Sequence, residues 1–244
     1  MPRGNFGPRA QAIVGYLTGR LALSHRDVVE AMETLHRLSL GLGSVAAIQN
    51  QVARALEQPV KTARQYVHQQ PVNHVDETGW PEGDKSNWLW INATPEVTVF
   101  HILEGRGQTE ARDVIGRGFC GIINTDRYAA YHWVDAHRRQ LCWAHLKRDF
   151  EAIKERGGAS AEIGEGLLEQ VKAVFELWRQ LKAGSLSREE FQRRMEPVRA
   201  EVKQILERGS ACDQEKTGGT CANLLRMSEL CVEVALVIGP DIFG

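Results

Sequence analysis

The chain of 244 residues has an ordinary globular composition, with 43% hydrophobic and 25% charged residues, which excludes collagen-like, fibrous and disordered proteins. No segment approaches the roughly 18 to 20 consecutive apolar residues that a transmembrane helix needs, and the first residues have no signal-peptide pattern. The five cysteines are odd in number and scattered, which favours reduced thiols over disulfide bonds. We therefore expect a cytoplasmic protein with no membrane segment, built as one large domain or two smaller ones.

The net charge of −1 is unevenly distributed along the chain. Residues 1–75 carry eight basic and four acidic side chains, whereas the remainder has more acidic than basic ones. A basic excess suits contact with nucleic acid. The first third of the chain is therefore the part whose charge favours such a partner.

Residues 1–70 have the pattern of helices joined by a turn. Ser24 followed by Asp27 predicts a helix start, and apolar residues then recur at helical spacing. After a glycine-containing turn, Ser44 is the expected N-cap of a second helix, which Pro59 ends or kinks. Such a pair either places its second helix in a DNA groove, as a helix-turn-helix does, or is a plain hairpin packed on the next domain. The expected DNA contacts are Gln49, Asn50, Gln51 and Arg54.

Residues 71–157 change to the pattern of strands. A short helix is expected over residues 109–115, between the third and fourth strands, and another begins after the last one. This order predicts an α/β fold with a mixed sheet. The predicted strands cover residues 72–76, 88–93, 97–103, 119–126 and 139–145.

Residues 158–229 are predicted to be a helical insertion, with two apolar stripes at helical spacing. Gly184 separates the stripes, and Ser187 with Glu190 predicts the start of the second helix. Pro197 predicts a kink within that helix. The simplest arrangement is an antiparallel hairpin.

Two aspartates, Asp76 and Asp126, end separate predicted strands. On adjacent strands their carboxylates would meet, and two ionised carboxylates at one place imply a divalent cation that offsets their repulsion. Oxygen ligands favour Mg²⁺ or Mn²⁺, and such ions support transfer of a phosphodiester to water or to a 3′-hydroxyl. The alternative is that both aspartates are ordinary cap and turn residues. Glu77 would point to the opposite face of an extended strand from Asp76, so it is not expected to share the metal.

Several ordered motifs resemble those of insertion-sequence transposases of the IS66 family. The similarity covers most of the chain. The motifs are Phe6–Arg9, Val75–Trp80, Trp88–Trp90, Thr125–Tyr131, Gln140–Phe150, Arg156–Gly158, Phe191–Met195 and Lys216–Thr220.

This resemblance implies a ribonuclease H-like core with an Asp, Asp, Glu triad that cuts and rejoins transposon DNA with Mg²⁺ or Mn²⁺. Asp76 and Asp126 match the first two carboxylates and would be metal ligands, and the partners would be transposon ends and target DNA in the nucleoid. Cys142 and His145 match a Cys-x-x-His signature, which places His145 beside the active site, where it would contact a phosphate or order a carboxylate. A zinc site at this pair would need two further ligands, for which no second pair has suitable spacing.

Three basic residues lie next to the site that the resemblance implies. Arg127, Lys147 and Arg148 are either phosphate contacts or solvated charges.

The sequence departs from the family pattern near its end. The third carboxylate is expected in an Asn-Asn-x-x-Glu-like segment, which does not occur, and residues 230–244 do not resemble the family. Glu229 and Glu233 are the acids nearest the expected place. The sequence therefore predicts a copy truncated at both ends, with weak or no strand-transfer activity. The alternatives are a non-catalytic DNA-binding or regulatory fragment, acting as a homo-oligomer or with a full-length transposase, and an inactive gene remnant.

Overall fold

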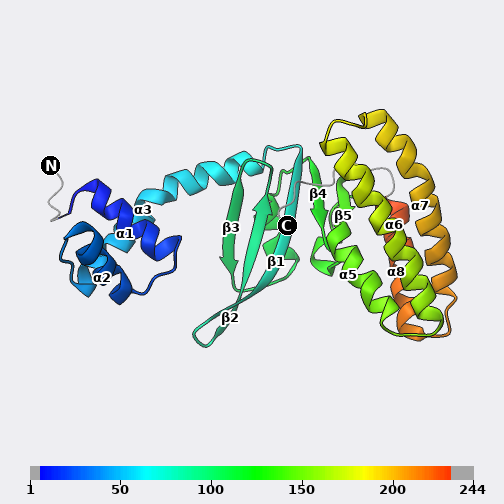
Figure 1. The fold of residues 1–244 in the computed structure, drawn as a ribbon, viewed down its shortest axis with the longest axis horizontal. Coiled ribbons are helices and arrows are strands. Elements are labelled where there is room, and N and C mark those ends of the chain that lie inside the picture. The colour runs from blue at the N-terminus through cyan, green and yellow to red at the C-terminus, as the bar shows by residue number, and fades with distance from the viewer. Residues whose placement is uncertain (1–5, 232–244) are drawn as a thin grey trace. The chain divides into compact units, whose positions relative to one another are not determined.

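The computed structural model describes residues 6–231, with side chains described as far as Met227. Two compact units make up the chain, Met1–Gln65 and Tyr66–Gly244, and Figure 1 traces their elements. No helix in the described range is long and apolar enough to cross a bilayer. The predicted aberrant tail and the side chains of Glu229 and Glu233 lie outside the described residues.

The first unit is helical, with α1 (Pro8–Gly19), α2 (His25–His36) and most of α3 (Leu42–Val67). The side chain of Ser24 accepts from the Asp27 amide, and the Asp27 side chain accepts from the Ser24 amide, so the predicted start of α2 is confirmed. α3 begins at Leu42, which places Ser44 in its first turn instead of at the N-cap. Pro59 does not end the helix, which continues to Val67.

A small apolar core holds these three helices together. Each helix turns one stripe inward, while the opposite faces stay in solvent. The buried members are Val14, Val28, Met32, Leu40, Val45 and Ile48.

The second unit contains a five-stranded sheet in the order β3-β2-β1-β4-β5. β1, β2 and β3 are antiparallel neighbours, whereas β4 and β5 run parallel to β1. The predicted α/β fold with a mixed sheet is therefore confirmed. The strands are β1 (Val72–Glu82), β2 (Lys85–Ala93), β3 (Thr98–Leu103), β4 (Ile122–Thr125) and β5 (Arg139–Leu141).

The first strand is longer than the sequence pattern predicted. β1 continues past Asp76 to Glu82 because it pairs with β2 from His74 onward, as far as the pair Glu82 and Lys85. Pairing with β4 covers only Val72 to His74. Asp76 therefore lies inside a strand, just beyond the part of it that has β4 as a neighbour.

One face of the sheet is covered by α4 (Gln108–Ile115) and by the segment that follows β4. Trp90 of β2 and Tyr131 meet edge to face, with ring centroids 6.3 Å apart, and both side chains are fully buried. Val75, Ile123 and Val114 complete the contact between sheet and helix. This packing fixes the chain on both sides of Asp126.

The last part of the described chain is a layer of four helices that pack in sequence order (Figure 1). α5 begins at Trp143, so the last predicted strand ends earlier than expected, at Leu141. The predicted hairpin is present as α6 and α7, with Ser187 accepting from the Glu190 amide at the start of α7, and α8 adds a further long helix. α7 continues through Pro197. The helices are α5 (Trp143–Lys154), α6 (Ala159–Lys182), α7 (Arg188–Ser210) and α8 (Glu215–Cys231).

A glycine allows α5 and α6 to approach closely. A Cβ atom added to Gly164 would lie 2.6 Å from the Cα atom of Lys154, which is backbone and cannot move aside. We expect Gly164→Ala to lower the free energy of unfolding by about 1–3 kcal/mol, because it forces the two helices apart. Thermal unfolding followed by circular dichroism measures this.

Gly219→Ala is the matched control, since a Cβ atom at this helical glycine meets nothing within 4 Å. Alanine favours a helix over glycine by about 1 kcal/mol, so this variant is expected to be as stable as the parent or slightly more so. Equal stability of the two variants would contradict the close approach at Gly164.

Candidate active site

The parallel pairing of β1 with β4 brings the two predicted catalytic aspartates to the same level of the sheet. The last paired residues are His74 and Asn124, and Asp76 and Asp126 each lie two residues further along. Neighbouring strands are about 4.8 Å apart. The side chains of Asp76 and Asp126 are 29% and 20% exposed, so both carboxylates are partly desolvated and open to a ligand.

Asp76 faces a histidine from the first turn of α5. The His145 Nε2 atom lies 3.6 Å from Asp76 Oδ2. The amide of His145 donates to the carbonyl oxygen of Cys142, the N-cap residue of α5. The position of the ring is therefore set by the start of this helix.

The charge state of His145 depends on both of its neighbours. Hydrogen bonding with the Cys142 thiol raises the pKa of His145, burial opposes this, and the negative charge of Asp76 raises it further, so that the pKa lies above its usual value. Burial raises the pKa of Cys142, but hydrogen bonds from His145 outweigh it and leave that pKa below its usual value.

Within the described range, no group of three His, Cys, Asp or Glu side chains is placed to hold a metal ion.

The neighbours of the Asp126 carboxylate are a backbone amide of the turn that follows it and an arginine from an earlier part of the chain. Its Oδ1 atom accepts from the Tyr128 amide at 2.8 Å, and the Arg106 Nη2 atom lies 4.0 Å from its Oδ2 atom. The Arg106 guanidinium also stacks on the rings of Tyr128 and Trp88, 4.0 and 4.8 Å from their centroids. This arrangement fixes a positive charge beside Asp126.

Glu77 is buried beneath the site and is fully occupied by protein partners. Its Oε1 atom accepts from Arg106 Nε at 2.8 Å, and its Oε2 atom accepts from the Tyr131 hydroxyl. Burial raises the pKa of Glu77 above its usual value, and the hydrogen bonds from Tyr131 and Arg106 oppose that rise. Sequence reasoning missed Arg106, because nothing in its spacing indicates that it reaches Glu77 and Asp126.

The three basic residues near the site differ in their surroundings. Arg127 donates from Nε and Nη2 to the two Asp149 oxygens, at 2.7 and 2.8 Å, and from Nη1 to Asn223 Oδ1 at 3.2 Å. Lys147 makes an exposed pair with Glu151 on α5, at 3.6 Å. Arg148 is exposed. Only Arg127 is held in one position by the fold.

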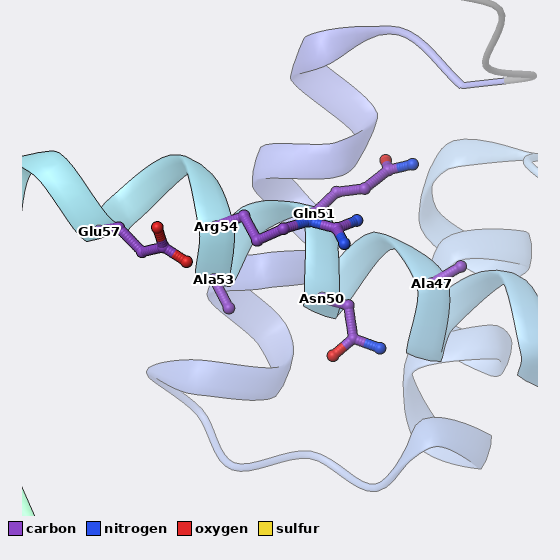
Figure 2. A pocket seen from close by; sticks show the side chains of 6 residues that line it. All are labelled: Ala47, Asn50, Gln51, Ala53, Arg54 and Glu57. Atoms are coloured by element: carbon purple, nitrogen blue, oxygen red, sulfur yellow. The ribbon is translucent and has the colours of Figure 1, made fainter.

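The expected DNA-binding residues of the first unit lie on one helix, α3. Gln49, Asn50, Gln51 and Arg54 are all exposed. The Gln49 Oε1 atom is 3.0 Å from His25 Nε2 of α2, so the amide oxygen of Gln49 already has a hydrogen-bond partner within the protein. Figure 2 shows a shallow pocket along α3, where Asn50, Gln51, Arg54 and Glu57 line one side of the helix.

The ion pair with Arg106 is expected to offset the free-energy cost of burying the Glu77 carboxylate. We expect Arg106→Gln to lower the free energy of unfolding by about 2 kcal/mol, since it leaves Glu77 buried with only Tyr131 as a partner. Adding Glu77→Gln in the same chain should restore most of the loss. Thermal unfolding of the single and double variants measures the coupling.

The control for this cycle is Arg117→Gln, which removes an exposed pair with Asp113 on α4. Exposed pairs contribute about 0–1 kcal/mol, so little change is expected. If Arg106→Gln were equally mild, or if Glu77→Gln gave no recovery, the pairing would not stabilise the site.

Comparison with known protein families gives a match over most of the chain. A family model described as "Transposase IS66 family" matches residues 4–230, a range that includes Asp76, Asp126 and His145. No curated protein and no solved structure matches the chain. Since the family model spans nearly the whole chain, the protein belongs to the IS66 family of transposases.

Proposed function

We propose that this transposase acts on the DNA of an insertion sequence by metal-dependent phosphoryl transfer, with Asp76 and Asp126 as catalytic carboxylates. The observation that carries the proposal is the strand pairing that brings both aspartates to one level of the sheet, two residues beyond the pair His74 and Asn124. Family membership supports DNA as the substrate.

The proposed core is ribonuclease H-like. Three antiparallel strands are followed by two strands parallel to β1, in the order β3-β2-β1-β4-β5. One acid lies on the central strand β1 and the other directly after its neighbour β4. This order and these two positions support the proposal.

The donor atoms of the two aspartates fit Mg²⁺ or Mn²⁺. The Oδ2 atoms of Asp76 and Asp126 lie 3.6 and 4.0 Å from His145 and Arg106, which is too long for hydrogen bonds. Both atoms are therefore available to a cation that prefers carboxylate oxygen. When bound, such an ion activates the attacking oxygen and stabilises the leaving oxygen of a phosphodiester.

The chain's own residues would position these donors. Arg106 would bridge the buried Glu77 carboxylate and the Asp126 carboxylate. His145 would orient the Asp76 carboxylate. Within residues 6–227, no further His, Cys, Asp or Glu side chain joins this pair in a group of three placed to hold a metal ion.

Binding of Mn²⁺ tests the site without depending on catalysis. At ten times its dissociation constant, Mn²⁺ is expected to stabilise the chain by about 1.4 kcal/mol. Asp76→Asn and Asp126→Asn should abolish this rise in the unfolding midpoint. Asp84→Asn, in the exposed turn after β1, removes one carboxylate elsewhere and should respond as the parent does. An equal response in all four proteins would contradict the proposed site.

Nicking of supercoiled plasmid tests the chemistry. Nicking by the parent is expected to be weak, because no third ligand joins the pair within the described residues. The nicking that depends on Mn²⁺ is expected to disappear in the Asp76 and Asp126 variants and to persist in Asp84→Asn. Nicking that survives both substitutions would place the reaction elsewhere.

A second function, DNA contact without chemistry, is favoured by the polar face of α3. We propose that Asn50, Gln51 and Arg54, with Gln49 beside them, contact DNA, because they are exposed together on one helix of a basic segment.

This contact predicts that Arg54→Ala weakens binding of the full chain to duplex DNA by roughly fivefold to tenfold, the usual effect of losing one charged contact. Fluorescence anisotropy measures it. Arg64→Ala is the control, since Arg64 is exposed on the same helix about 15 Å further along the axis. Equal weakening by both variants would indicate a general charge effect instead of a site.

A further inference from the structure

We propose that a cationic groove between the start of α8 and the segment after β4 holds the phosphodiester backbone of DNA beside Asp126. This proposal rests on the proposed function, since it supplies the path of the strand that the carboxylates would act on. The groove-lining residues that carry the argument are Arg127, Arg156, Lys216, Gly219, Thr220 and Asn223.

Arg156 is held in the groove by neutral partners. Its Nη1 atom donates to Thr217 Oγ1 at 3.0 Å. Thr217 is fully buried and is fixed by hydrogen bonds of 2.8 Å to Ser160 and to Gln214. The guanidinium is therefore positioned by the fold without a carboxylate that would neutralise it.

The face of α8 toward the groove is polar and small. The positions on this face follow Lys216 by three, four and seven residues, and they are Gly219, Thr220 and Asn223. This spacing places all four residues on one side of a helix. Asn223 accepts from Arg127 Nη1 at 3.2 Å, and this contact ties α8 to the residue that follows Asp126. The groove is thus lined by the residue that directly follows the proposed catalytic Asp126 in the chain.

The charges in the groove suit a phosphate chain. Asp149 balances Arg127, but within the described residues neither Arg156 nor Lys216 makes an ion pair, and no acid lines the groove. Arginine and lysine are the side chains that bind phosphate, and the DNA backbone repeats that charge along its length. An uncompensated pair of cations in the groove that Arg127 also lines therefore points to a DNA strand.

Two sequence motifs without an assigned role meet in this groove. Arg156–Gly158 and Lys216–Thr220 are about sixty residues apart, and the bond between Arg156 and Thr217 joins them. The glycines after Arg156 have φ angles of +76° and +55°, which allow the chain to leave α5 there and turn into α6. The groove gives both motifs one function.

Gly219 allows a direct test of the groove. Because a Cβ atom there meets nothing within 4 Å, Gly219→Glu should fold normally and place a carboxylate among the cations. We expect it to weaken binding to a labelled DNA duplex by roughly tenfold or more through repulsion of phosphate. Gly219→Gln has the same size without the charge and should bind as the parent does.

The cation itself is tested at Lys216. Lys216→Gln should weaken binding and reduce the slope of log K against log salt by about 1, as loss of one phosphate contact does, whereas Lys216→Arg should retain both. Lys203→Glu, an exposed charge change on α7, should leave binding nearly unchanged. Circular dichroism and unfolding midpoints establish that each variant is folded.

All binding is measured by fluorescence anisotropy in EDTA, in the parent and in the Arg54→Ala chain, so that the contact of α3 does not hide the effect. Asp126→Asn should bind DNA at least as tightly as the parent. If the aspartate variants keep the parent's Mn²⁺-induced rise in the unfolding midpoint but Gly219→Glu binds DNA more weakly, the result contradicts the proposed catalytic site and supports the groove. If Gly219→Glu binds like Gly219→Gln, or if Lys203→Glu is as harmful as Lys216→Gln, the groove proposal is overturned.

Discussion

The parallel pairing of β1 with β4 is the constraint on which the rest of the second unit depends. It brings Asp76 and Asp126 to the same level of one sheet although fifty residues separate them in the chain. Ionised carboxylates on neighbouring strands at one level of a sheet repel each other, and partial burial strengthens such repulsion. The side chains around Asp76 and Asp126 are therefore expected to keep both carboxylates in place.

A histidine and an arginine face the two aspartates. His145, at the start of α5, lies against Asp76, while Arg106 lies between Asp126 and the buried Glu77. The aromatic rings of Tyr128 and Trp88 fix the Arg106 guanidinium, and they do so without adding another charge. Neither His145 nor Arg106 lies within hydrogen-bond distance of the Oδ2 atom that it faces.

The helical layer extends this site through a few polar contacts. Arg127 connects the turn after β4 to α5 through Asp149 and to α8 through Asn223. Arg156 connects the end of α5 to α8 through Thr217. These bonds cross between helices that are distant in sequence, and they join the helical layer to the turn that contains Asp126.

The sequence by itself predicted most of the helices and strands, and it singled out Asp76 and Asp126 as candidate catalytic residues. Alternating and helical periodicity predicted the strands and most of the helices, because each reflects one buried face, and the ordered motifs indicated the family. Tertiary structure alone decided the length of β1, which depends on pairing with β2, and the roles of Arg106, Glu77 and Thr217. These side chains act through partners about thirty to sixty residues away, and local pattern carries no information about such contacts.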